Sequence, residues 1–333
     1  MRITVLGSKV FDSLEFHVVD SLRHLNHEVV HIDITDVLPI SYKYTYWIQK
    51  VSMSLDEVIF KKIANKVIDS NPDLVICTYR NINPIAIHLI KNNIKNVVII
   101  HLNPDNLNTL GYQQIFASPY DAYFSKDPFI VDFMKNKMML NTHYLPEAFN
   151  HRIHKPPLVE NRESHETDID VDVVAFGTMY PYRARVIQNL INADINVSLY
   201  GTSDTKLPSK DLKKNFKNEY ITGDRKSEVL YGAKIVFNNF YYAEVNCVNV
   251  KFFEISGIGA FQVCDYKSVI EDYSFIPTDS FTFRTINEGI DLIKYYLDKP
   301  RLRHKLAEKQ MEHFIKYHTY DVRMHELLNI LFR

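Results

Sequence analysis

The sequence predicts an α/β fold with two parallel-sheet domains that face a cleft. Three observations support this. Apolar strand-like segments alternate with helix-like segments from the first residues onward, a polar, charge-rich stretch interrupts the pattern near residues 160–172, and the alternation then starts again. A length of 333 residues suits two domains of about 150 residues each.

The first half contains five short apolar runs separated by helical periodicity. Gly7-Ser8 forms the turn after the first strand, and Pro128 suits the first turn of the last helix. Strands are expected at residues 2–6, 28–34, 73–78, 97–101 and 121–125, and helices at 11–25, 54–69, 84–92 and 127–135. This succession is typical of a Rossmann-like domain, which we place at residues 1–150.

Residues 151–170 are expected to form a hinge, because Pro156-Pro157 and the charged stretch after it are poor in apolar side chains. A second Rossmann-like domain follows at residues 171–320. Its predicted strands begin with residues 171–176, 197–200 and 235–240. A terminal helix at residues 321–333 is predicted to pack back on the N-terminal domain.

Composition excludes several classes of protein. A formal net charge of −1 argues against a general nucleic-acid-binding surface. No apolar run approaches the roughly 20 residues of a membrane span, although peripheral membrane association is compatible with the sequence. Three scattered cysteines indicate neither a disulfide framework nor a zinc site, and no signal sequence is recognisable, so we expect a cytoplasmic protein.

The stretch from Asn249 to Gly259 carries the clearest chemistry. Asn249 suits the cap of a short helix, whose free N–H groups attract an anion. Lys251 and Glu254 lie three residues apart and so share one face of that helix. A phosphate beside the lysine and sugar hydroxyls beside the glutamate would make a nucleotide-sugar site. An ordinary amphipathic helix with an ion pair is the alternative.

Four segments of the second half form an ordered set. They are Phe176-Gly-Thr-Met-Tyr180 with Arg183, Leu199-Tyr-Gly201, Tyr231-Gly-Ala-Lys-Ile-Val-Phe-Asn238, and Asn249-x-Lys-x-Phe-Glu254-x-x-Gly-x-Gly259. In this order and spacing the set resembles the donor-binding domain of GT-B glycosyltransferases of group 1. It looks closest to the spore-maturation CgeB-like branch, and the resemblance covers about residues 143–320.

The resemblance implies roles for individual residues. Glu254 matches the glutamate that takes the ribose hydroxyls, and Arg183 matches an arginine that faces the diphosphate. Lys251 stands where the branch usually has arginine, which keeps the charge but changes the phosphate geometry. The full set of expected donor-binding residues is Gly177, Tyr180, Arg183, Asn249, Lys251, Glu254 and Gly257.

Two features depart from the broader group 1 pattern. Glu244 lies ten residues before Glu254, whereas the group carries two glutamates with seven residues between them, so Glu244 receives no role. The first loop offers only Gly7-Ser8 in place of a glycine-rich loop.

No metal or other cofactor is expected. Asp170-Val-Asp172 fits the bare metal-binding pattern of other transferases, but it stands at the entry of a strand and is interpreted as structural. His143, His151 and His154 lack an acidic or cysteine neighbour at ligand spacing and are interpreted as solvated loop residues.

On the acceptor side, His101 and Asp105 are the candidate catalytic residues, because they follow a strand at its carboxyl end. A hydrogen-bonded loop histidine is the alternative for His101.

We therefore expect a metal-independent, hexosyltransferase-like enzyme of polysaccharide biosynthesis. It would move a sugar from a nucleotide-sugar donor to a glycan, lipid-linked or protein acceptor. Two alternatives remain open at this stage: a non-catalytic nucleotide- or sugar-binding module with a double Rossmann fold, and a sugar-nucleotide epimerase of similar architecture.

Overall fold

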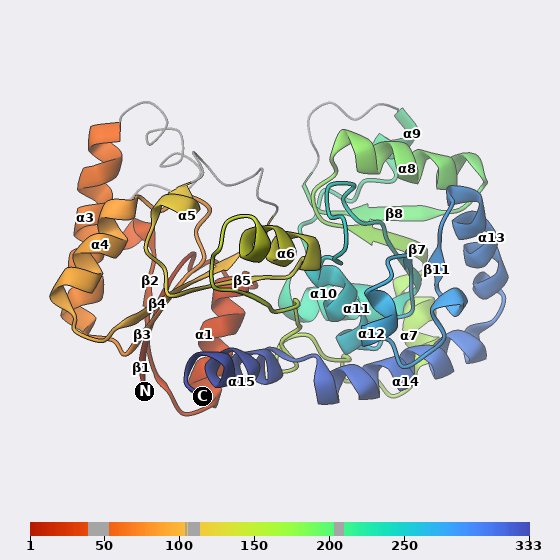
Figure 1. Cartoon of the computed structure of the whole chain (residues 1–333). Coiled ribbons are helices and arrows are strands. Elements are labelled where there is room, and N and C mark those ends of the chain that lie inside the picture. The colour runs from red at the N-terminus through yellow and green to blue at the C-terminus, as the bar shows by residue number, and fades with distance from the viewer. Residues whose placement is uncertain (39–52, 104, 106–113, 203–209) are drawn as a thin grey trace. The chain divides into compact units, whose positions relative to one another are not determined.

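The computed structural model describes residues 1–38, 53–103, 105, 114–202 and 210–333 (Figure 1). The chain divides into two compact units. Unit 1 comprises Met1–Pro146 together with Arg323–Arg333, and unit 2 comprises Glu147–Val322. Each unit has its own parallel sheet, as the alternation of strands and helices predicted.

Unit 1 contains a six-stranded sheet in the order β2-β1-β3-β4-β5-β6, with every neighbouring pair parallel. The strands are β1 (Arg2–Leu6), β2 (Glu28–Ile32), β3 (Leu74–Cys77), β4 (Val98–Asn103), β5 (Ala122–Ser125) and β6 (Thr142–Tyr144). The helical segments are α1 (Leu14–His24), η1 (Ile34–Asp36), α3 (Met53–Ser70), α4 (Pro84–Asn93), α5 (Gln114–Ala117) and α6 (Pro128–Asn136).

Local signals fix where the helices of unit 1 begin. Ser13, Asn83 and Asp127 cap α1, α4 and α6, each accepting a hydrogen bond from the backbone of the first turn. Proline occupies the first turn of α4 and α6, where its missing N–H costs nothing.

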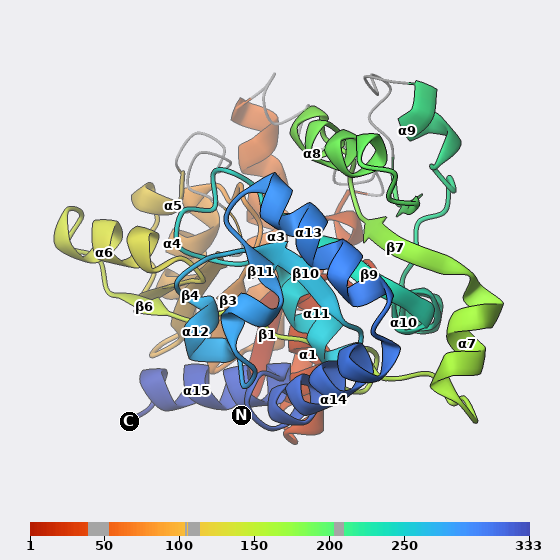
Figure 2. The same ribbon diagram turned by 90° about the vertical axis from the view of Figure 1, so that its right-hand side faces the viewer.

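Unit 2 contains a five-stranded parallel sheet in the order β11-β10-β9-β7-β8, and Figure 2 shows β7, β9 and β10 side by side. The strands are β7 (Val171–Phe176), β8 (Val197–Tyr200), β9 (Ala233–Asn238), β10 (Gln262–Asp265) and β11 (Thr282–Phe283). The helical segments are α7 (Arg162–Ile169), α8 (Pro181–Asn192), α9 (Lys210–Lys214), α10 (Gly223–Gly232), α11 (Val250–Ile258), α12 (Ile270–Tyr273), η4 (Thr278–Ser280), α13 (Ile286–Leu297), α14 (Pro300–Tyr317) and α15 (Tyr320–Leu331), the last of which continues into unit 1.

Both faces of the unit 2 sheet are covered by helices. Ile235 and Phe237 of β9 belong to a core cluster with residues of α8 and α13, whereas Val236 belongs to a second cluster with residues of α10 and α11. Because successive side chains point to opposite faces, a strand covered on both sides is apolar along most of its length. This explains the uninterrupted apolar runs of the sequence.

The predicted hinge is partly a packed helix. Asn161 caps α7, and Glu166 on α7 is buried, with Arg303 Nη2 at 2.8 Å and His304 Nε2 at 2.7 Å. Glu166 is the buried member of this segment, whereas Glu160, Glu163, Asp168 and Asp170 are exposed.

None of the helices in the described ranges has the length and hydropathy that crossing a membrane requires.

Candidate functional site

The turn that follows β7 brings two cations to one backbone oxygen. The carbonyl oxygen of Phe176 accepts hydrogen bonds from Arg183 Nη1 at 2.6 Å and from Lys251 Nζ at 2.8 Å. Arg183 comes from the first turn of α8, and Lys251 comes from the first turn of α11. Two helix N-termini of unit 2 thus deliver one positive charge each to the carboxyl end of β7.

Gly177 makes this convergence possible. Its φ of +104° lies in a region that favours glycine, and a Cβ atom there would lie 2.7 Å from Lys251 Nζ and 3.3 Å from Arg183 Nη1. The backbone therefore comes within contact distance of both cations only because no side chain intervenes. The sequence singled out this glycine for the same turn.

Arg183 is a buried cation that has no carboxylate partner among the described residues. Its side chain is 5% exposed, and its Nε and Nη2 atoms are buried without a hydrogen-bond partner in the described part of the chain. Burial lowers the pKa of Arg183 to about 10. Buried charges are normally paired. The arrangement is therefore incomplete unless an anion approaches.

Lys251 is part-buried, with its ammonium beside the guanidinium of Arg183. Burial lowers its pKa well below the usual range, and the nearby charge of Arg183 lowers it further. Among the described residues, no carboxylate lies within ion-pair distance of either cation. Two neighbouring cations that share a neutral acceptor form an electrostatic site for a dianion or a larger polyanion.

The N-terminus of α11 is held rigidly beside this pair. Asn249 accepts a hydrogen bond from the N–H of Phe252 at 3.1 Å, which confirms the predicted cap. Its side chain also exchanges hydrogen bonds with Asn238 at the end of β9, and Asn238 donates to Gln262 of β10. This amide network fixes the positive end of the helix at the carboxyl edge of the sheet.

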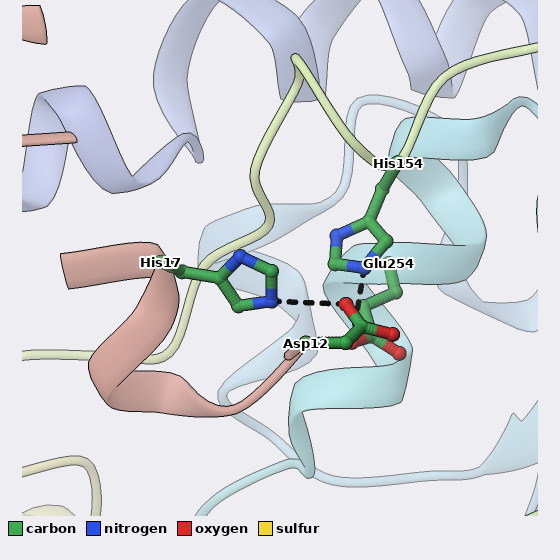
Figure 3. A group of neighbouring side chains, drawn as sticks. All are labelled: Asp12, His17, His154 and Glu254. Carbon is green, nitrogen blue, oxygen red and sulfur yellow. Dashed lines mark ion pairs between the residues drawn. The ribbon is translucent and has the colours of Figure 1, made fainter. Parts of the chain in front are cut away.

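Glu254 lies one turn further along α11 and is 4% exposed. Its Oε1 atom is 3.1 Å from Lys226 Nζ and 3.5 Å from His154 Nε2, and the pair with His154 is drawn in Figure 3. Lys226 Nζ is also 3.4 Å from His154 Nε2. The carboxylate is therefore fixed by a buried cation and a buried imidazole, neither of which is close to it in the sequence.

His154 corrects one interpretation of the sequence. It was interpreted as a solvated loop residue, but its side chain is fully buried and faces Glu254. Figure 3 also draws a histidine and carboxylate pair that belongs to unit 1, in which His17 Nε2 lies 3.1 Å from Asp12 Oδ1. Within unit 2, the ammonium of Lys226 supplies a positive charge at Glu254.

Gly257 has a packing role that the sequence did not reveal. The resemblance implied bare backbone beside a nucleotide, but a Cβ atom at Gly257 would meet the ring of Phe149 at 2.2 Å. Phe149 is fixed by backbone hydrogen bonds with His318 and Tyr320. The space that a Cβ atom at Gly257 would occupy is therefore filled by an aromatic ring of unit 2, and the implied ligand contact stays a prediction.

Tyr180 is the N-cap residue of α8, and its side chain makes no capping hydrogen bond. The ring is 55% exposed and lies 6.5 Å from the ring of Tyr241, between centroids. Tyr180 thus faces solvent beside the glycine turn and is free to contact a ligand there.

His101 lies inside β4 rather than after it. The ring is 2% exposed, Nε2 is 3.1 Å from the carbonyl oxygen of Tyr79, and burial lowers the pKa of His101 to about 4. The edge of the ring also contacts Tyr120. This is the environment of a hydrogen-bonded core histidine in a strand, whereas the alternative predicted a hydrogen-bonded histidine in a loop.

Asp105 is part-buried and forms an ion pair with Arg80 Nε in unit 1. The structure does not bring its carboxylate into hydrogen-bond contact with His101. The two candidate catalytic residues therefore have different partners, the carbonyl oxygen of Tyr79 for His101 and Arg80 for Asp105.

Sequence reasoning missed three members of the site. Lys226, His154 and Gln262 carried no motif, and only Asn238 had appeared in the ordered set of segments. Their common signal is that each is a buried polar side chain. That signal exists only in three dimensions.

Comparisons with known structures agree with this architecture. Sucrose-phosphate synthase from Thermosynechococcus elongatus is 11% identical, with a TM-score of 0.68 and 99% of each chain covered. HepE from Anabaena, solved with UDP and glucose, is 10% identical, with a TM-score of 0.65 and 99% of each chain covered. The chain has the GT-B fold.

A third GT-B structure is the lipopolysaccharide outer core galactosyltransferase WaaB, which is 11% identical, with a TM-score of 0.60 and coverage of 100% of this chain and 99% of the other. Residues 183–329 match a family model described as "Glycosyl transferase-like". The match contains Arg183, Lys251 and Glu254. No curated protein matches the chain by sequence.

Proposed function

We propose that this GT-B protein is a glycosyltransferase that moves a sugar from a nucleotide-sugar donor to an acceptor. The observation that carries the proposal is the pair of cations on the carbonyl oxygen of Phe176. Arg183 and Lys251 meet at a glycine turn and at the start of α11, and no carboxylate of the described residues lies within ion-pair distance of either. A diphosphate supplies the charge that this arrangement lacks.

The proposed chemistry follows from charge. As the glycosidic bond to the donor breaks, negative charge accumulates on the departing nucleoside diphosphate. Preorganised cations and a helix N-terminus stabilise that charge more in the transition state than in the bound donor. Arg183 and Lys251 perform this task in the proposal, and the dipole of α11 adds to it. We propose that transfer is metal-independent, since these groups supply positive charge at the diphosphate.

Glu254 is proposed to accept hydrogen bonds from the ribose hydroxyls, with Lys226 holding its carboxylate in place. The ordered segments that resemble the CgeB-like branch support a place in that branch and a hexosyl donor. A glycan, a lipid-linked sugar or a protein is the proposed acceptor. The buried ring of His101, with its pKa near 4, has no part in this mechanism.

The first test is calorimetric titration of the protein with UDP, GDP, dTDP and CMP, followed by measurement of donor hydrolysis with the matching nucleotide sugar. We expect one diphosphate to bind. Arg183→Gln should lower turnover about 100-fold, because it removes a donor to the leaving group. Arg185→Gln is the matched control, since Arg185 is exposed on the same helix.

Glu254→Gln should weaken nucleotide binding about tenfold and should reduce the preference for UDP over 2′-deoxy-UDP if uridine is the base. Nucleotide binding without hydrolysis or transfer would indicate a binding module. Unchanged binding and turnover in both variants would show that the site is elsewhere.

A further inference from the structure

Four exposed tyrosines gather on unit 2 beside the proposed diphosphate site. We call this group the tyrosine platform; its members are Tyr180, Tyr182, Tyr241 and Tyr242, with exposed fractions of 55%, 38%, 39% and 66%. Tyrosine and tryptophan rings that stay in water at a fixed place on a surface are typical of binding sites.

The rings of the platform form a contiguous surface. The centroids of Tyr182 and Tyr242 lie 5.3 Å apart, and those of Tyr241 and Tyr242 lie 4.5 Å apart. The hydroxyls of Tyr241 and Tyr242 are hydrogen-bonded at 3.2 Å. Tyr180 adjoins Tyr241 at 6.5 Å. The surface therefore combines aromatic faces with a polar rim of phenolic hydroxyls.

The segment that carries Tyr241 and Tyr242 is anchored on both sides. Before them, Phe240 is buried, and its N–H donates to Asp265 Oδ2 at 2.6 Å. After them, Lys267 Nζ donates to the carbonyl oxygens of Glu244 and Val245. An anchored segment that keeps its tyrosines in solvent loses little conformational entropy when a ligand covers them.

The platform and the cation pair are built on the same two segments. Tyr180 and Tyr182 directly precede Arg183, at the carboxyl end of β7. Tyr241 and Tyr242 follow β9 and lead to α11, which carries Lys251. Each segment thus contributes one cation and two exposed rings at the carboxyl edge of the sheet, which is where the proposed leaving group binds.

The chemistry of the platform fits sugar rings. A pyranose has an apolar C–H face, which packs on an aromatic ring, and a polar edge, which hydrogen-bonds to hydroxyl groups. A surface of four rings is larger than a single donor sugar. A chain of linked sugars is long enough to cover it. The end of an acceptor chain must also reach the carbon of the donor sugar that is bonded to the diphosphate.

We propose that the tyrosine platform binds successive sugar rings of a glycan acceptor. The inference rests on the proposed function and specifies its acceptor class: a glycan rather than a protein or a lipid-linked single sugar. It assigns part of the acceptor binding to unit 2, in addition to the donor binding already proposed for that unit.

The test uses a printed array of bacterial capsular, lipopolysaccharide and wall glycans with the full-length protein. Wild type should bind at least one glycan class, and Tyr182→Ala/Tyr242→Ala should reduce that signal about tenfold, as expected when stacking anchors are removed. Tyr242→Phe should keep most of the signal, because the ring face remains. Tyr220→Ala is the matched control, since Tyr220 is 66% exposed, as Tyr242 is.

Titration of the same samples with UDP, GDP, dTDP and CMP separates the two proposals. Nucleotide binding that the double variant leaves unchanged, together with loss of glycan binding, supports the platform. The inference is overturned if wild type binds no printed glycan or if the double variant binds as wild type does. Glycan binding without binding of any nucleotide would overturn the proposed function but would still support glycan binding by the tyrosine platform.

Discussion

Arg183 and Lys251 donate to the same backbone oxygen, that of Phe176. The two residues are separated by 67 others in the sequence, so the fold brings their charges together. Like charges on one acceptor repel each other, and Arg183 is buried while Lys251 is part-buried. The fold thus keeps two positive charges close together at a cost in stability. Such a cost is expected at a binding site whose charges must be positioned before the ligand binds.

Replacing Lys251 with methionine should stabilise the free protein and weaken nucleotide binding. Burial depresses the pKa of Lys251, so below that depressed pKa the folded state holds an unfavourable charge. The folded state sheds this proton before the unfolded state does, and wild-type stability therefore rises as pH increases from the depressed pKa towards the ordinary value of 10.5.

The gain from Lys251→Met should accordingly be greatest at low pH, about 1 kcal/mol or more, and should shrink through this window. Urea unfolding from about pH 6 to pH 10 measures it. Lys234→Met is the control, since Lys234 is ion-paired with Asp172 at 2.6 Å. A loss of stability in Lys251→Met at every pH would contradict the strained-cation interpretation.

The alternation of strands and helices was predictable because its signals are local. Apolar strands, capping side chains and first-turn prolines act within a few residues, and the cap by Asn249 could be predicted for that reason. The glycine turn at Gly177 was recognisable from its place directly after a strand.

Contacts between residues far apart in the sequence could not be predicted from it. The α7 segment resembled a linker because Glu166 is charged, and its burial depends on Arg303, 137 residues away. Glu254 was found, but its partner Lys226 was not, since no pattern joins the two. His101 was expected at the end of a strand, but β4 continues for two residues beyond it, and an apolar run does not mark that boundary.

Gly257→Ala should damage stability and spare the nucleotide site. A methyl group there would overlap the ring of Phe149, which is fully buried and cannot swing into solvent. Overpacking of this kind typically costs about 1–3 kcal/mol. Chemical denaturation should show the loss, and calorimetry on the folded fraction should show unchanged nucleotide affinity. A selective loss of affinity with normal stability would support the ligand role that the resemblance implied.

His101 should report on acid stability and leave turnover nearly unchanged. Its folded-state pKa of about 4 lies below the ordinary 6.5, so the unfolded chain binds the proton more readily. Stability contributed by the neutral ring is full above pH 6.5 and is lost as pH falls towards 4, by up to about 3 kcal/mol.

His101→Met removes this titration, and the difference in unfolding free energy between wild type and variant should therefore change across that window. Donor hydrolysis and transfer should stay within about threefold of wild type once both are folded. A drop in turnover of several hundredfold without a change in stability would identify His101 as the base after all.

Lys226→Met should be the most damaging of the single substitutions in unit 2. Glu254 would keep its charge in a buried site without the ammonium that lies 3.1 Å away, and removing one partner of a buried pair typically costs about 3–5 kcal/mol. Arg225→Met is the matched control, because the neighbouring Arg225 is nearly half exposed and its ion pairs in the described part of the chain are with surface carboxylates.

Lys226→Met/Glu254→Gln should recover much of the lost stability but not nucleotide affinity. The neutral amide needs no counter-charge, yet it binds ribose hydroxyls less well than a carboxylate does. Unfolding curves of the four proteins, and titrations with the nucleotide that wild type binds, measure both quantities. If Lys226→Met alone were as stable as wild type, Glu254 would have to be neutralised by another group, and the role of Lys226 in holding the carboxylate would be wrong.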